Sequence, residues 1–340
     1  MSQSKDKIDM NKNILKISFL ILLSRLVGRC PIRVMHFCTF RCNLHCKYCG
    51  IWKTPKREMT TQQIKKAMKE FAGAGTIFWT FTGGEPLLRK DIGELVNYAK
   101  SLFPIVTLTT NALLLKERIE EIKNVNYFTI SIDGPKEITD FNRGKGTFDK
   151  TLEGIKIARD YGKDVVINAV ISKANVKNNF YGIRKLIDIA SNFGCKLNFS
   201  TLYVDQFNNS NKGIKDTLLT NEERIRALEF IRKMKNEKFN FIMFSNPCIE
   251  NLKYFKKWKK CYAGKLFCDL FPDGTVVPCL FRETQGIDGM KCGFVKAFNM
   301  LPSNENCSCG STCYTELNCI FSLKFRSVIE NLLKYLSFVR

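Results

Sequence analysis

The sequence predicts an α/β protein built as a partial (βα)6 barrel followed by a small cysteine-rich C-terminal domain. Between residues 33 and 237, short β-branched or aromatic runs alternate with longer helical patterns, which is typical of βα units and a parallel sheet. Six such units are too few for a closed eight-unit barrel, which takes about 250 residues. Nine of the 15 cysteines lie between residues 248 and 319, where helical periodicity is weak.

The expected elements alternate in chain order. Strands are expected at residues 33–37, 76–81, 105–109, 127–132, 165–171 and 196–202. Helices are expected at residues 60–72, 91–102, 116–123, 148–161, 178–193 and 221–236. Several of these helices begin with Asn, Asp or Thr, which cap the free N–H groups of a first turn.

The chain is expected to divide into four parts. These are a basic amphipathic N-terminal arm (1–30), the barrel (31–240), the cysteine-rich domain (241–322) and a C-terminal amphipathic helix (323–340). The apolar run at residues 14–27 is interrupted by Lys16 and Arg25, and it falls short of the roughly 20 apolar residues of a membrane span. Because the sequence shows no cleavable signal peptide, we expect a cytoplasmic protein. The alternative is that the two basic termini contact a membrane surface.

Composition restricts the metal chemistry. The chain has only two histidines, His36 and His45, so a multi-histidine site is excluded and thiolates must be the main ligands. In a reducing compartment, clustered cysteines indicate metal sites before disulfides. The net charge of +22 is suited to binding nucleic acid, an anionic membrane surface or an acidic peptide. The sequence contains no recognisable nucleic-acid-binding module, so no nucleic-acid partner is expected.

Three cysteines follow the first expected strand. Cys42, Cys46 and Cys49 lie in one eight-residue segment and can converge on a single centre. Three soft ligands suit an iron–sulfur cluster with one open iron, or a zinc site that takes a fourth ligand. His45 could complete the zinc site, although it is adjacent to Cys46.

This Cys-x3-Cys-x2-Cys segment, with the aromatic Tyr48 before its last cysteine, resembles that of the radical S-adenosylmethionine (SAM) enzymes. The resemblance implies a radical SAM barrel in which Cys42, Cys46 and Cys49 bind a catalytic [4Fe–4S] cluster. SAM would chelate the fourth iron through its amino and carboxylate groups. One electron would then split SAM into methionine and a 5′-deoxyadenosyl radical.

Further segments resemble the SAM-binding parts of this family. Gly83-Gly84-Glu85-Pro86 follows the second strand and is similar to the motif that holds the SAM amino group, with Glu85 as an acceptor and the glycines allowing close backbone approach. The other candidate cofactor-binding residues are Tyr48, Thr110, Asn111, Ser131, Asp133, Arg143 and Asn168. Among these, Arg143 would pair with the SAM carboxylate and Asn168 would face the ribose.

A second cysteine group begins with Cys261 and Cys279, which flank an Asp-Gly turn between two apolar runs. An expected hairpin would bring them together. This pattern resembles the SPASM and twitch domains of radical SAM enzymes, and it implies one or two auxiliary [4Fe–4S] clusters. The candidate metal ligands are Cys261, Cys279, Cys307, Cys309, Cys313 and Cys319, with Cys268 and Cys292 as further possibilities. The spacing of the last group departs from the full SPASM pattern, and a zinc-stabilised cap is the alternative.

These features predict a radical SAM enzyme that abstracts hydrogen from a substrate, with peptide or protein modification favoured. The alternative within this class is a lipid or isoprenoid substrate at the membrane surface, suggested by the amphipathic termini. The alternative of another class is a non-catalytic zinc or iron–sulfur scaffold that binds nucleic acid or a partner protein. The expected partners are the substrate and an electron donor such as a ferredoxin or flavodoxin.

Overall fold

The computed structural model describes residues 28–203, 213–237, 239–303 and 305–322. Almost all of the expected N-terminal arm and the whole of the expected C-terminal helix lie outside the described residues. Within the described ranges, no helix is both long enough and apolar enough to cross a membrane.

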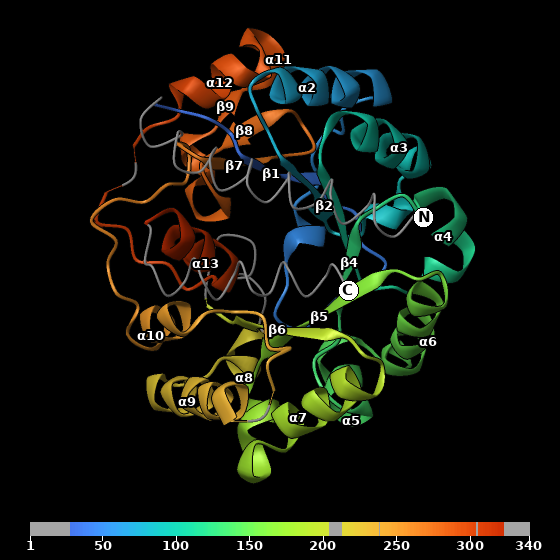
Figure 1. Cartoon of the computed structure of the whole chain (residues 1–340), viewed down its shortest axis with the longest axis vertical. Coiled ribbons are helices and arrows are strands. Elements are labelled where there is room, and N and C mark those ends of the chain that lie inside the picture. The colour runs from blue at the N-terminus through green and yellow to red at the C-terminus, as the bar shows by residue number, and fades with distance from the viewer. Residues whose placement is uncertain (1–27, 204–212, 238, 304, 323–340) are drawn as a thin grey trace, which may run out of the picture.

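A curved parallel sheet forms the centre of the molecule (Figure 1). Its first six strands are β1 (Arg33–Thr39), β2 (Phe78–Gly83), β3 (Ile105–Thr110), β4 (Tyr127–Ser131), β5 (Asp164–Ile171) and β6 (Lys196–Thr201). Each begins and ends within two residues of its expected position, and neighbours in sequence pair in parallel in the order β1 to β6. The predicted α/β class and the open barrel are confirmed.

Helices cover the outer face of the sheet. Those of the barrel are α2 (Thr61–Gly73), α3 (Ile92–Leu102), α4 (Leu115–Ile122), α5 (Lys136–Arg143), α6 (Thr147–Asp160), α7 (Lys173–Asn192), α8 (Ile214–Thr217) and α9 (Asn221–Glu237), with short 3-10 turns η1 (Ile51–Lys53) and η2 (Pro86–Leu88). The Thr60 hydroxyl accepts from the Gln63 backbone N–H and the Gln63 side chain accepts from the Thr60 N–H, so α2 begins with a capping box. Within α7, residues 178–180 have positive φ angles, so its regular part follows them.

The C-terminal part extends the same sheet. Strand β7 (Phe267–Leu270) pairs in parallel with the free edge of β1, and β8 (Thr275–Val277) and β9 (Ile287–Asp288) continue antiparallel. The Asp-Gly turn closes the predicted β7–β8 hairpin, with Gly274 at a φ of +89°. Sequence patterns did not predict the pairing of β7 with β1, because the four-residue strand is short and buried along its whole length.

Five further elements complete the described chain: α10 (Asn246–Tyr254), η3 (Leu280–Gln285), α11 (Gly289–Cys292), α12 (Phe294–Met300) and α13 (Thr312–Phe321). Helix α13 connects β6 with β7, which pairs with the other edge of the six-strand array. At β6, the Thr312 hydroxyl accepts from the Thr201 N–H, and at β7 the Tyr314 hydroxyl donates to Asp269 at 2.5 Å. The C-terminal part therefore lies against the opening of the barrel.

The main hydrophobic core lies between the sheet and the outer helices. Trp79 on β2 is fully buried there and stacks on Phe103 at a ring distance of 4.9 Å. His36 on β1 is also fully buried, edge-on to Trp79. Burial lowers the pKa of His36 to about 3, so this side chain is a neutral part of the core.

Replacing Trp79 with alanine removes the largest side chain of this core and leaves a cavity. We expect Trp79→Ala to lower the free energy of unfolding by about 3–5 kcal/mol, measured by urea denaturation. Met300→Ala, at a side chain that is 55% exposed, should change it by less than about 0.5 kcal/mol. Equal effects of the two substitutions would contradict the packing described here.

Candidate functional site

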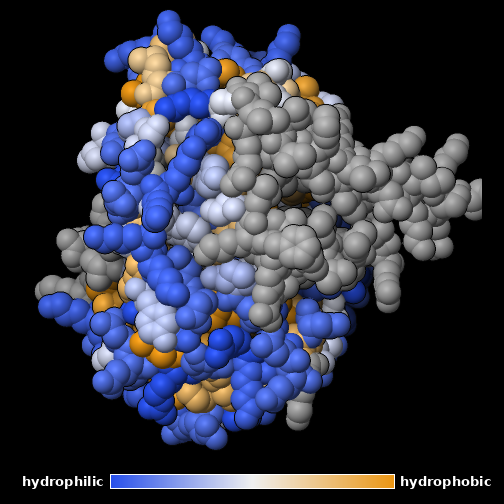
Figure 2. Space-filling model, turned by 60° about the vertical axis from the view of Figure 1, so that its left-hand side comes forward, coloured by the Kyte–Doolittle hydropathy of each residue, from blue (hydrophilic) through white to orange (hydrophobic). Residues whose placement is uncertain are grey.

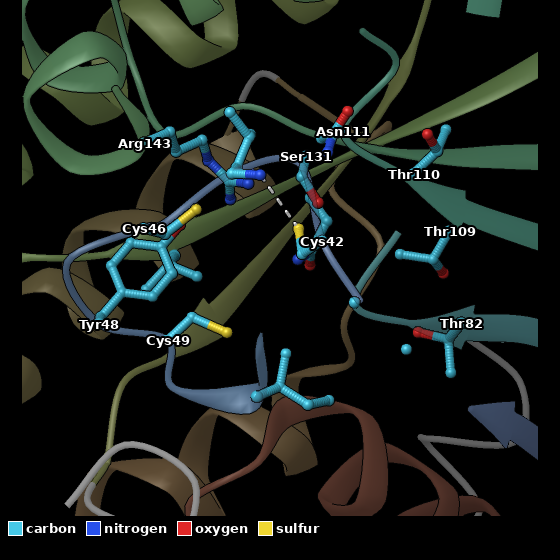
Figure 3. Close-up of a pocket in the computed structure, with 16 residues that line it drawn as sticks. Cys42, Cys46, Tyr48, Cys49, Thr82, Thr109, Thr110, Asn111, Ser131 and Arg143 are labelled. Atoms are coloured by element: carbon cyan, nitrogen blue, oxygen red, sulfur yellow. Dashed lines mark hydrogen bonds between the residues drawn. The ribbon is translucent and has the colours of Figure 1, made fainter. Parts of the chain in front are cut away.

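Three cysteines of the loop after β1 border one cavity at the carboxyl end of the strands. Cys42, Cys46 and Cys49 line a cavity of about 200 Å³, and Figure 3 shows their side chains on three sides of the same space. His45 does not line it; its ring lies against Trp52 at 4.0 Å. The loop therefore presents three thiols, and the histidine that could have made a fourth ligand packs elsewhere.

Burial determines the protonation of these thiols. It raises the pKa of Cys42 to about 11 and that of Cys49 to about 12, and it also raises the pKa of Cys46. Cys42 and Cys46 are close enough to Cys49 for their charges to raise its pKa further. Free thiols would thus be protonated at neutral pH, and binding of a cationic metal centre would have to displace their protons.

Gly83 and Gly84 hold the cysteine loop against the end of β2. The Gly84 N–H donates to the Thr39 carbonyl at 2.8 Å, and the Glu85 N–H donates to the Arg41 carbonyl at 2.8 Å. A Cβ at Gly83 would lie 2.2 Å from the Thr39 oxygen, and one at Gly84 would lie 2.2 Å from the Arg41 oxygen. Only glycine allows this backbone approach, and both glycines line the cavity.

Glu85 lies behind the cavity wall. Its carboxylate is fully buried and accepts from the Thr110 hydroxyl at 2.8 Å and from the backbone N–H groups of Asn111 and Leu87 at 2.8 and 3.0 Å. Thr110 and Asn111 line the cavity, whereas Glu85 does not. In this structure Glu85 therefore positions the ends of β2 and β3.

Asp133 has the same role on the other side of the cavity. It is fully buried and receives bonds from the Arg143 guanidinium at 2.8 Å, the Tyr48 hydroxyl at 2.7 Å and the Val170 N–H at 3.1 Å. Arg143 and Tyr48 line the cavity, but Asp133 does not. The ion pair with Asp133 orients Arg143, which lies beside the cysteine loop in Figure 3.

The remaining expected residues also reach the cavity. Ser131 and Asn168 line it from β4 and β5, and the Asn168 side-chain oxygen accepts from Asn198 and Ser200 at 2.9 and 3.0 Å. Sequence reasoning missed Thr82, which lines the cavity with Thr109 opposite Arg143 in Figure 3. It also missed Asn43, Asn198 and Ser200, which contact lining residues. The signal that could have identified Thr82 is its position at the carboxyl end of a parallel strand.

A second group of thiols lies under β7 and α13. Burial raises the pKa of Cys279, and the charges of Asp269, Cys309 and Cys261 raise this pKa further. Burial raises the pKa of Cys309 to about 12, and the charges of Cys261 and Cys307 contribute to this rise. The same hydrophobic cluster contains Cys261, Cys279 and Cys309, with Cys307 packed against it. We call these four the auxiliary thiols: Cys261, Cys279, Cys307 and Cys309.

Cys313 also packs against this hydrophobic cluster, but its surroundings differ from those of the auxiliary thiols. The Cys313 sulfur contacts the Met35 sulfur at 3.8 Å, beside Arg33 and Asp269 on the inner face of the sheet. Cys319 is fully buried in the main core, as is Cys268. Cys292 donates to the Asp288 carbonyl. Cys307, and not Cys313, lies close enough to Cys261 and Cys309 for its charge to raise the pKa of both, so we assign Cys307 to the auxiliary thiols.

The arrangement of the thiols indicates which kind of metal centre they could hold. Within the described residues, no three His, Cys, Asp or Glu side chains converge closely enough to hold a single metal ion. Cys42, Cys46 and Cys49 border a cavity instead of meeting at a point, as a polynuclear centre with several irons requires. Beside the first group, the Arg143 Nε is buried and has no hydrogen-bond partner in the described structure, which leaves a donor for an anionic ligand. The donor sets fit a [4Fe–4S] cluster with SAM and an auxiliary cluster.

Comparisons with known proteins give a family match for part of the chain. Residues 37–187 match the model of the Radical SAM superfamily. Fe-coproporphyrin III synthase of Methanosarcina barkeri is 34% identical over 41% of this chain and 37% of that protein. PqqA peptide cyclase of Bradyrhizobium diazoefficiens is 29% identical over 76% of this chain and 69% of that protein. The structure of native anSMEcpe with bound AdoMet and Cp18Cys peptide has a TM-score of 0.63 and 20% identity, over 79% of this chain and 81% of that chain, so the two share a fold.

The buried Glu85 carboxyl should make stability depend on pH. Burial raises its pKa from 4.5 to about 7, so between these values the folded chain holds a proton that the unfolded chain releases. Its contribution to stability is therefore fully present below about pH 4.5 and is lost as pH rises through about 7. As pH rises from about 5 to about 8, the free energy of unfolding should fall less in Glu85→Gln than in the wild type, because the amide does not titrate. Urea denaturation at each pH measures this difference.

The exposed Glu117 provides the matched control for this measurement. Glu117→Gln should keep the pH dependence of the wild type, because an exposed carboxyl is solvated in both states. The same pH dependence in Glu85→Gln and the wild type would contradict a titrating carboxyl at this position.

Proposed function

Residues 37–187 are a radical SAM domain, and from this premise we propose that the protein is an enzyme that cleaves SAM reductively and abstracts hydrogen from a peptide substrate. The single observation that carries the proposal is the cavity shared by Cys42, Cys46 and Cys49 with the Gly83-Gly84 backbone and Arg143. When bound there, a [4Fe–4S] cluster with SAM supplies a 5′-deoxyadenosyl radical after one-electron reduction. The chain's own residues hold and orient these groups.

Each side of the cavity has a distinct task in this proposal. The three thiols hold the cluster after losing their protons, and the missing fourth cysteine leaves one iron for SAM. The close backbone approach at Gly83 and Gly84 offers carbonyl oxygens to the SAM ammonium. Arg143, held by Asp133, offers its unpaired Nε to the SAM carboxylate.

The polar strand ends take the nucleoside part of SAM. Asn111, Ser131 and Asn168 present amide and hydroxyl groups to the cavity and are suited to the ribose and adenine. Glu85 and Asp133 are positioning residues, since their carboxylates bond to the protein itself and do not line the cavity.

The auxiliary thiols hold a second [4Fe–4S] cluster in this proposal. Four thiols are a complete ligand set for such a cluster. Asn318 supports the set, because its amide donates to the Cys261 sulfur at 3.3 Å, and Arg282 lies 3.9 Å from the Cys307 sulfur. Charged and amide donors stabilise thiolates and tune the potential of a cluster. One auxiliary cluster, rather than two, agrees with the contact of the Cys313 sulfur with Met35 and with the burial of Cys319 in the main core.

A peptide is the favoured substrate. PqqA peptide cyclase aligns with three quarters of this chain, and the fold is shared with a structure that carries a bound peptide. The lipid alternative was suggested by the amphipathic termini, which lie outside the described residues. A ferredoxin or flavodoxin is the electron donor that we propose for either substrate.

Reconstitution under anaerobic conditions tests the proposed reaction. We expect about eight irons per chain, four in each cluster, and formation of 5′-deoxyadenosine from SAM with dithionite. Cys42→Ala, Cys46→Ala and Cys49→Ala should each lose about half of the iron and all SAM cleavage. Cys195→Ala, at a buried cysteine remote from both groups, is the control and should keep both. Absence of SAM cleavage in the reconstituted wild type would contradict the proposal.

The auxiliary thiols can be distinguished from their neighbours by a second series. Cys307→Ala should lose about four irons and the charge-transfer absorbance of one cluster, measured by iron analysis and visible spectroscopy. Cys313→Ala, six residues further along the chain, should keep the full iron content. The reverse result would show that Cys313, and not Cys307, is the ligand.

A further inference from the structure

A strongly basic surface lies beside the auxiliary thiols. Residues 253–265 contain six lysines and no acidic residue, and four of these lysines are exposed: Lys256, Lys257, Lys259 and Lys260. Lys256 lies 3.7 Å from Glu250, whereas the buried Lys253 is paired with Glu229 and Glu250. We define the basic patch as Arg29, Lys257, Lys259, Lys260 and Lys265.

The backbone places this patch directly over two of the auxiliary thiols. The Trp258 N–H donates to the Cys307 carbonyl at 2.9 Å in an isolated β-bridge, and the Trp258 side chain is buried. Side chains alternate along extended chain, which agrees with the exposure of Lys257 and Lys259 on either side. Lys260 immediately precedes Cys261. The exposed lysines of the basic patch are therefore held next to Cys307 and Cys261 in the chain.

A cavity connects the patch to Cys261. Arg29, Lys260 and Lys265 line a cavity of about 350 Å³ together with Cys261 itself. Glu305 is the one acidic residue among those that line it. The Arg29 guanidinium donates to the carbonyls of Gly264 and Phe298 at 3.0 and 3.3 Å, so its charge is anchored without a carboxylate partner in those bonds. The cavity is therefore positively charged and reaches a thiol.

Such an arrangement suits a transient acidic partner. A local excess of one charge accelerates association with a partner of opposite charge, mainly through the rate of encounter. Electron-transfer complexes are small and weak, with total interfaces below about 1,200 Å², and need the two redox centres close together. The face brought forward in Figure 2 is largely hydrophilic where it is not covered by grey atoms, which is consistent with a weak and reversible contact.

We propose that the basic patch docks a small acidic electron-transfer protein of the flavodoxin or ferredoxin type, which delivers its electron beside the auxiliary thiols. In this step the reduced flavin or iron–sulfur centre of the carrier loses one electron and the auxiliary cluster gains it, with no bond made or broken. This inference rests on the proposed function, because it requires a redox centre at these four thiols. A donor that docks at the patch would reduce the auxiliary cluster before the catalytic one.

Binding of an oxidised flavodoxin to the reconstituted full chain tests the patch, measured by isothermal titration calorimetry at about 50 and 300 mM salt. Lys257→Glu/Lys259→Glu should raise Kd at least about tenfold at low salt and reduce the salt dependence of binding. Lys257→Arg/Lys259→Arg keeps the charge and should bind as the wild type does.

The matched control reverses two exposed lysines of α6, Lys150 and Lys156, on the side of the sheet opposite the chain between α10 and β7 in Figure 1. Lys150→Glu/Lys156→Glu makes the same change in net charge and should alter Kd by less than about twofold. Equal weakening by the two double variants would overturn the proposal, because only the net charge of the protein would then matter.

Two further measurements separate the outcomes. Dithionite needs no docking, so Lys257→Glu/Lys259→Glu should form 5′-deoxyadenosine with dithionite at the wild-type rate and lose the reaction driven by reduced flavodoxin. No product with dithionite in the wild type contradicts the proposed function, while the binding experiment still tests the patch. If single-stranded RNA or phosphatidylserine vesicles bind through Lys257 and Lys259 and flavodoxin does not, the patch has another partner and the proposal is overturned.

Discussion

Strand β1 is paired in parallel on both edges, with β2 on one side and β7 on the other, and both thiol groups depend on this arrangement. Its carboxyl end leads directly into the loop of Cys42, Cys46 and Cys49. On the β7 side, the hairpin places Cys279 at its end, next to the thiols that flank α13. One central strand thus sets the positions of two cysteine groups that are more than 200 residues apart in sequence.

Buried carboxylates at the strand ends make the cavity wall rigid. Glu85 connects the end of β2 to Thr110 and Asn111 after β3, and Asp133 connects β4 to Arg143, Tyr48 and β5. Buried polar groups are costly unless they are bonded, so each carboxylate favours one arrangement of its neighbours. The residues that face a ligand are consequently held by residues that do not. The basic patch beside the auxiliary thiols is the surface at which we propose that an electron donor docks.

Local patterns were sufficient for the barrel and for most of the cavity. The six strands follow from β-branched runs and their turns. The resemblance to radical SAM enzymes selected Asn111, Ser131 and Asn168 at or near the carboxyl ends of strands, and all three line the cavity. Tertiary packing decided the rest. Cys307 and Cys313 are both near Cys309 in sequence, but Cys313 lies on α13 and is turned toward Met35 when that helix packs across the barrel opening. Spacing cannot indicate which face a helix buries, just as it could not show that β7 would join β1 or that Glu85 and Asp133 would lie behind the wall.

This fold gathers seven of its 15 cysteines into a group of three and a group of four, and we propose that each group surrounds a polynuclear iron centre. Anomalous X-ray diffraction from a crystal of the anaerobically purified full chain, recorded at the iron absorption edge, tests it most directly. We expect two separate iron peaks in the anomalous difference map. One peak should be bordered by Cys42, Cys46 and Cys49, and the other by Cys261, Cys279, Cys307 and Cys309. A single iron peak, a peak beside Cys313, or a signal at the zinc edge in place of iron would contradict it.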